Sequence, residues 1–64
     1  MKQFLGLTWE QALEEAARQG REVQIHEETE FEDAWIEVST SEGNGAALEF
    51  EDGVVSYYEF LMWL

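Results

Sequence analysis

The sequence predicts an α+β domain in which one N-terminal helix packs on a mainly antiparallel sheet of three to four strands. Three observations support this class: a helical period of apolar residues before Gly20, a period of two after it, and a later Asp-Gly turn. A chain of 64 residues has room for a single domain, residues 1–64. Because 45% of the residues are hydrophobic, we expect a folded core rather than disorder.

The first predicted element is a helix over Trp9–Gln19. Thr8 and Gln11 have the spacing of a capping box, in which each side chain satisfies the backbone amide of the other residue. Intervals of three and four residues place the apolar side chains on one face: Trp9, Ala12, Leu13, Ala16 and Ala17. We expect Gly20 to end the helix, because glycine readily takes the left-handed cap conformation.

Four strands are predicted after the helix, at residues 22–26, 34–39, 46–51 and 54–60, from apolar residues that alternate with polar ones. Asp52-Gly53 predicts a tight hairpin of type I′, in which both central residues have positive φ. With a two-residue loop, the register places Phe50 opposite Val55. The further pairs in that register are Leu48 with Tyr57, Glu49 with Ser56, and Glu51 with Val54.

This register predicts an acidic face on the sheet, on the side away from the core. Glu49 and Glu51 would lie there together with Glu37, and with Glu22 if the first strand turns its apolar residues inward. Tyr58 and Phe60 would join them on that outer side.

Charge is the most unusual property of the sequence. It contains 15 acidic residues against three basic ones, for a net charge of −12. Lys2, Arg18 and Arg21 balance the three acidic residues of the first 21 positions, and no lysine or arginine follows them. Such a chain repels nucleic acids, anionic membranes and acidic substrates, because binding them requires lysine and arginine. We therefore expect no direct nucleic-acid binding and no membrane partner.

The absence of cysteine excludes disulfides and thiolate metal sites, so reducing cytoplasm is the expected compartment. The longest apolar run is far shorter than the roughly 20 residues of a membrane-spanning helix, and we recognise no signal peptide. The only histidine, His26, stands in an ordinary strand context, and the serines carry no catalytic motif. We expect no enzyme, no cofactor and no metal; the acidic run after His26 lacks the spacing of a calcium loop.

Twelve uncompensated charges oppose folding in so small a domain, and therefore suggest a function. Duplex DNA carries one charge for roughly every 1.7 Å of its axis, a density of the same order as this surface. We expect a stoichiometric inhibitor that mimics nucleic acid and blocks a basic DNA- or RNA-binding protein. The expected contacts are five acidic residues of one loop, three of the sheet and two aromatic anchors: Glu27, Glu28, Glu30, Glu32, Asp33, Glu37, Glu49, Glu51, Tyr58 and Trp63.

In size, acidity, lack of cysteine and α-plus-β layout, the whole chain resembles phage-encoded anti-CRISPR and anti-restriction proteins. This resemblance implies inhibition of a host defence complex in the host-cell cytoplasm. It rests on no shared motif, so it assigns no individual residue a role.

Two alternatives remain open. Residues 5–12, the helix that ends at Gly20 and residues 48–55 resemble small bacterial serine-protease inhibitors of the potato-inhibitor type. That resemblance implies a reactive loop at residues 39–46, where the arginine-containing segment usual in the family is missing. The other alternative is an acidic self-associating module, with a homodimer formed through the apolar segment Tyr57–Leu64.

Overall fold

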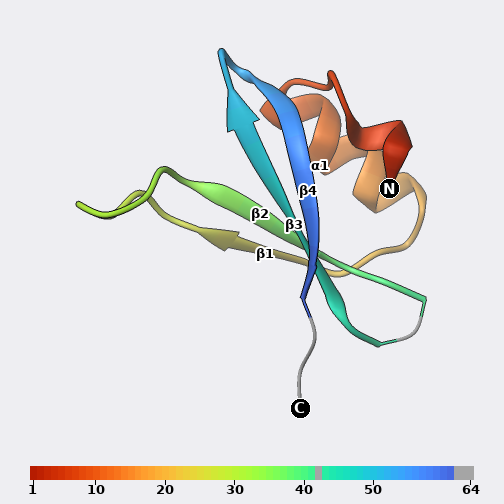
Figure 1. Cartoon of the computed structure of the whole chain (residues 1–64). Coiled ribbons are helices and arrows are strands. Elements are labelled where there is room, and N and C mark those ends of the chain that lie inside the picture. Colours follow the sequence, from red (N-terminus) through yellow and green to blue (C-terminus); the bar gives the residue numbers. More distant parts are fainter. Residues whose placement is uncertain (42, 62–64) are drawn as a thin grey trace.

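The chain folds as one helix against a four-stranded antiparallel sheet, as predicted (Figure 1). This computed structural model describes residues 1–41 and 43–61. Within them no helix is long and apolar enough to cross a membrane. The strands follow the order β1-β2-β3-β4. The elements are η1 (Lys2–Phe4), α1 (Trp9–Arg18), β1 (Val23–His26), β2 (Trp35–Ser39), β3 (Gly45–Glu51) and β4 (Val54–Leu61).

Both ends of α1 form the predicted caps. The Gln11 amide donates to Thr8 Oγ1 at 3.3 Å, and the Thr8 amide donates to Gln11 Oε1 at 3.0 Å. At the other end Gly20 has φ +70°, and the amide of Arg21 donates to the carbonyl of Ala16 at 2.9 Å. Since this left-handed cap begins to close at Gln19, the helix ends at Arg18, one residue earlier than predicted.

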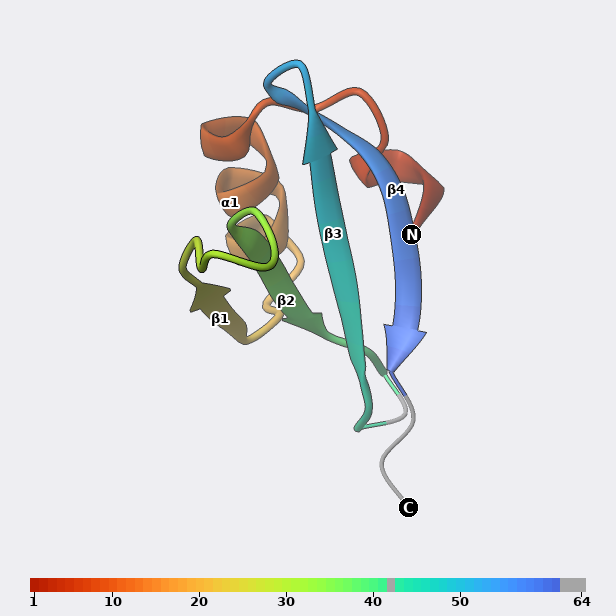
Figure 2. The same ribbon diagram turned by 60° about the vertical axis from the view of Figure 1, so that its left-hand side comes forward.

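The segment before α1 belongs to the core, which the sequence did not predict. Phe4 is fully buried, and residues 6–8 run beside β4 (Figure 2). The Gly6 amide donates to the carbonyl of Val55 at 2.8 Å, and the Val55 amide donates to the carbonyl of Leu7 at 2.8 Å. The N-terminal segment therefore covers the start of β4, which would otherwise be an open sheet edge.

The core lies on one side of the sheet. Its buried residues come from η1, α1, β2, β3 and β4: Phe4, Ala12, Ala16, Ile36, Val38, Ala46, Leu48 and Val55. Val23 and Ile25 pair with Val38 and Ile36, so they point to the same side, as expected. They nevertheless stay 38% and 51% exposed, because β1 is an edge strand with a neighbour on one side only.

A β-bulge in β4 corrects the predicted register. The type I′ turn is confirmed, with φ 54° at Asp52 and 82° at Gly53, and Phe50 pairs with Val55. Beyond that pair, Glu49 faces Tyr57 and Leu48 faces Tyr58, so the predicted pairs Leu48–Tyr57 and Glu49–Ser56 are wrong. Ser56 is the extra residue, and its hydroxyl donates to the carbonyl of Glu49 at 3.4 Å.

The bulge also reverses the faces predicted for the second half of β4. Tyr58 packs against the core instead of joining the acidic side, and Phe60 pairs with the core residue Ala46. Tyr57 and Glu59 take the outer positions in their place, opposite Glu49 and Ala47. Successive side chains of a strand point to opposite faces of the sheet. One extra residue therefore moves every side chain that follows it to the other face.

Truncating Phe4 tests the role of the N-terminal segment. We expect Phe4→Ala to lower the free energy of unfolding by about 3–5 kcal/mol, because a fully buried ring leaves a cavity. A loss of that size removes much of the stability of a small domain. Urea unfolding measures it, with Phe4→Leu as the milder control. A loss below about 1 kcal/mol for Phe4→Ala would contradict the packing described.

Candidate functional site

The side of the sheet away from the core carries carboxylates from three strands. We call it the outer face and define it by Glu37 of β2, Glu49 and Glu51 of β3, and Tyr57 and Glu59 of β4. Glu49 and Glu51 are two residues apart on one strand, a spacing of about 6.6 Å. Strand pairing therefore fixes an array of negative charges, as the sequence predicted, with Glu59 as an unpredicted member.

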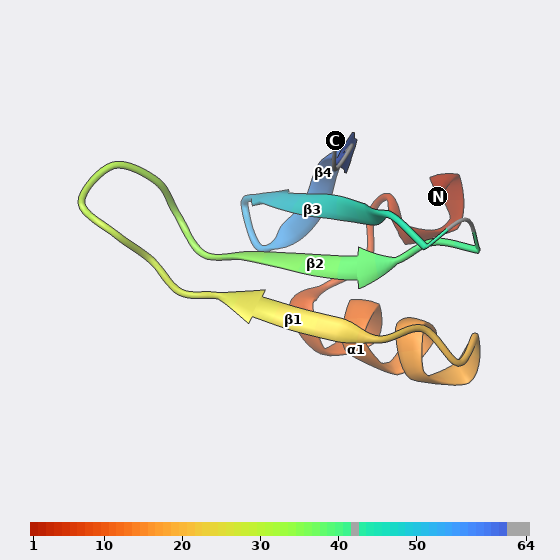
Figure 3. The same ribbon diagram turned by 90° about the horizontal axis from the view of Figure 1, so that it is seen from below.

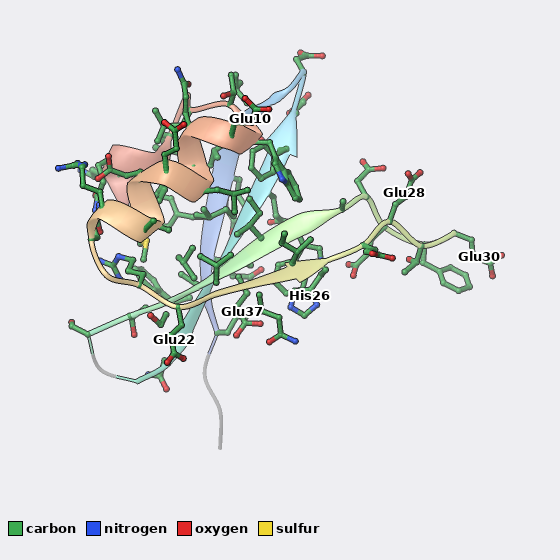
Figure 4. All side chains as sticks on the ribbon, turned by 180° about the vertical axis from the view of Figure 1, so that it is seen from behind. Glu10, Glu22, His26, Glu28, Glu30 and Glu37 are labelled. Atoms are coloured by element: carbon green, nitrogen blue, oxygen red, sulfur yellow. The ribbon has the colours of Figure 1, made fainter. Side chains whose placement is uncertain are left out.

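Glu37 is the most constrained carboxylate of the outer face. Its side chain is 18% exposed, and its Oε1 lies 3.0 Å from Nε2 of His26. The His26 ring stacks on Trp35, with ring centroids 3.8 Å apart and planes 2° from parallel. Figure 4 shows Glu37 and His26 side by side below the β1–β2 pair. The sequence analysis placed His26 in an ordinary strand context and did not predict this contact, because a neighbour on another strand cannot be identified from the local pattern.

Gly45 gives Glu37 the space that it occupies. A Cβ built on Gly45 would lie 2.7 Å from Glu37 Oε2, closer than side chains approach. The Glu37 carboxylate thus lies over Gly45 of β3, and it is hydrogen-bonded to His26 of β1. Of the predicted contact residues on the sheet, Glu37 is consequently the least free to reach a partner.

The loop between β1 and β2 carries the densest charge. We call residues 27–33 the acidic loop; it extends away from the sheet and helix (Figure 3). Figure 4 shows Glu28 and Glu30 along it, well apart from Glu37. The five predicted contact residues of the acidic loop are all exposed: Glu27, Glu28, Glu30, Glu32 and Asp33.

Backbone hydrogen bonds hold the tip of the acidic loop in a turn. The Thr29 amide donates to the carbonyl of Glu32 at 2.9 Å. The Thr29 hydroxyl accepts from the amides of Phe31 and Glu32 at 3.2 and 3.1 Å. Near the sheet, Nε1 of Trp35 donates to Glu32 Oε1 at 3.2 Å. The sequence predicted a loop here, and the structure shows that the tip of this loop has a defined turn.

Phe31 is the residue of this site that the sequence analysis missed. Its side chain is 89% exposed, the largest fraction among the large apolar side chains of residues 1–41 and 43–61. The signal was present in the sequence, because Phe31 is the only apolar residue between His26 and Ala34 and has no alternating partner. It thus makes no contribution to the core and stands among carboxylates.

The acidic loop and the sheet meet at a shallow pocket of about 270 Å³. Glu32 and Asp33 line it from the loop, and Glu49 lines it from β3. Trp35 and Phe50 supply aromatic walls. The structure therefore joins two groups of predicted contact residues at this point, whereas Glu51 lies beyond it beside the β3–β4 turn.

The two predicted aromatic anchors have different outcomes. Tyr58 is half-buried against the core and contacts Phe60 edge-on, with ring centroids 5.8 Å apart. Trp63 lies outside the described residues. Tyr57, which was not predicted as an anchor, is 54% exposed on the outer face. Because Tyr57 pairs with Glu49 across β3 and β4, an exposed aromatic ring lies beside that carboxylate.

Positive charge compensates little of this surface. In residues 1–41 and 43–61, the ion pairs are Arg18 with Glu15, inside α1, and His26 with Glu37 when the histidine is protonated. The hydrogen bond from Arg18, helped by one from Gln19, holds the pKa of the Glu15 carboxyl below its ordinary value. The acids of the acidic loop have no such partner within the described part of the chain.

The segment expected to hold a protease-inhibitory loop, residues 39–46, joins β2 to β3. Ser39 belongs to β2, while Gly45 and Ala46 belong to β3. Between them, the Thr40 amide donates to the carbonyl of Asn44 at 2.8 Å. Strand pairing of Ser39 with Gly45 and the bond from Thr40 to Asn44 therefore hold the described residues at both ends of this segment.

The chain matches no protein-family model, no curated protein and no solved structure.

The unpaired acids predict that salt stabilises the fold. Raising NaCl from about 0.01 M to 0.15 M shortens the Debye length from roughly 30 Å to 8 Å and weakens carboxylate repulsion. We expect the melting temperature to rise, by about 4–8 °C for each kcal/mol by which the free energy of unfolding increases. Glu28→Gln with Glu30→Gln should show a smaller rise, because less repulsion remains to be screened. A melting temperature that falls with salt would show that attractive pairs dominate.

Proposed function

We propose that this chain is a stoichiometric inhibitory binding protein that mimics the charge of nucleic acid. Its partner is a basic DNA- or RNA-binding protein, of the kind found in host defence complexes. The chain acts in the cytoplasm, where that partner is located. The observation that carries this proposal is the exposed run of carboxylates on the acidic loop, none of them paired with lysine or arginine within the described residues.

Two features of the geometry support binding to a cationic groove. The acidic loop extends from the body of the protein, so it can enter a concave surface that a flat sheet cannot reach. The outer face lies beside the root of this loop, where Glu32, Asp33 and Glu49 line one pocket. A groove that receives the loop would therefore also meet the carboxylates of β3.

Electrostatics favours rapid and salt-sensitive association. A net charge of −12 attracts a basic surface over distance, which raises the rate of encounter at low ionic strength. The cost of removing carboxylates from water is offset where each meets a lysine or arginine. A binder of this kind needs no catalytic group or cofactor.

Capture by this 64-residue chain from a lysate of the host cell in which it acts tests the class of partner. We expect a captured protein that binds nucleic acid and that added DNA or RNA releases. Release by high salt but not by either nucleic acid would contradict the mimicry, because the binding surface would then lie elsewhere.

Charge reversal tests the site. We expect Glu28→Lys with Glu30→Lys to weaken binding to the captured protein about 100-fold, because like charges in contact cost several kcal/mol. Glu10→Lys with Glu14→Lys changes the net charge equally on the exposed side of α1, and should weaken binding less than about threefold. Isothermal titration gives both values. Equal losses for the two variants would remove the acidic loop from the site.

A further inference from the structure

We infer that Phe31 takes the place of an unstacked base, so that the acidic loop imitates a single strand of nucleic acid rather than a duplex. This inference rests on the proposed function and specifies its partner. The partner it fits is a single-strand-binding groove, in which lysines and arginines surround an aromatic or apolar base pocket.

The first step is that Phe31 has no role in the fold. Its ring is 89% exposed and is absent from the core and from the half-buried residues that pack on it. Phe4, of the same type, is fully buried. An exposed phenyl ring forgoes burial that would stabilise a small domain, so it suggests a contact made outside the chain.

The second step is that Phe31 is presented at a fixed place. The turn closed by Thr29 and Glu32 makes Glu30 and Phe31 its central residues, at the loop tip. The Phe31 amide is itself bonded to the Thr29 hydroxyl at 3.2 Å. Less conformational freedom is therefore lost on binding than for a ring on an unstructured loop.

The third step is the charge around the ring. Glu30 and Glu32 flank Phe31 in the chain, and Glu27, Glu28 and Asp33 complete the acidic loop. A purely apolar pocket would have to strip water from these carboxylates without compensation, which is costly. A second copy of the chain and an anionic membrane would both repel them. The binding surface that remains compatible with both the ring and the charges is an apolar or aromatic pocket with lysines and arginines at its rim.

That combination is the chemistry of single-strand recognition. Proteins that bind single strands use a basic groove along the backbone and aromatic side chains on which the bases stack. In a duplex the base faces are hidden within the stack, so an exposed ring has no counterpart there. A ring between two carboxylates, by contrast, has the order of a base between two phosphates.

Three blocked tripeptides, Lys-Trp-Lys, Lys-Leu-Lys and Lys-Gly-Lys, test the inference without a natural partner. They carry equal charge, so NMR titration of the full chain at low salt separates ring stacking from attraction between charges. We expect Lys-Trp-Lys to bind roughly two- to twelvefold more tightly than Lys-Leu-Lys, the advantage typical of an aromatic pair. Phe31→Ala should abolish that preference, and Phe31→Trp should keep it.

Tyr57→Ala is the matched control, because it removes another exposed ring from the outer face and should leave the preference intact. Equal binding of the tryptophan and leucine peptides, or a preference that survives Phe31→Ala, would overturn the inference. If all three peptides bind equally and salt weakens them, the nucleic-acid mimicry stands without the base-like ring. If none binds at low salt, the proposed function fails as well.

Discussion

The alternation of side chains along each strand is the constraint on which both faces of this sheet depend, and the bulge at Ser56 preserves it in β4. Without the bulge, Glu59 would take the core-side position opposite Ala46, and Tyr58 would turn to the acidic side. With it, Tyr58 packs on the core and Glu59 faces water. One extra residue thus places Glu59 on the outer face, together with the carboxylates of β2 and β3.

Local signals were sufficient for much of this fold. The capping box, the glycine that ends α1 and the Asp52-Gly53 turn each depend on residues within a few positions of one another. The bulge was missed because Tyr57 and Tyr58 give no alternation, so sequence alone could not show which ring the core accepts. Phe4 was missed for a related reason: it packs in one core cluster with residues that are distant in the chain, from Ala12 to Val55.

The candidate site was predicted in its charges but not in its shape. Five exposed acids between two strands made the acidic loop identifiable from composition. The closeness of His26 to Glu37 arises from the pairing of β1 with β2, which composition does not encode. The bond between Glu32 and Trp35 is local, but it depends on how the loop bends before β2, which composition does not encode either. As a result, the predicted contact residues differ: Glu37 is hydrogen-bonded to His26 and Glu32 accepts from Trp35, whereas Glu27, Glu28, Glu30 and Asp33 are exposed on the acidic loop. A partner therefore gains most from the loop.

The N-terminal segment has a consequence for the order of folding. All three strand pairs join neighbours in the chain, so the sheet can assemble hairpin by hairpin through contacts of short sequence separation. The bonds between Gly6, Leu7 and Val55 are the exception, because they close nearly the whole chain into a loop. The ring of Phe4 therefore reaches its final surroundings only when the start of β4 is in place, because the segment that carries it is bonded to Val55.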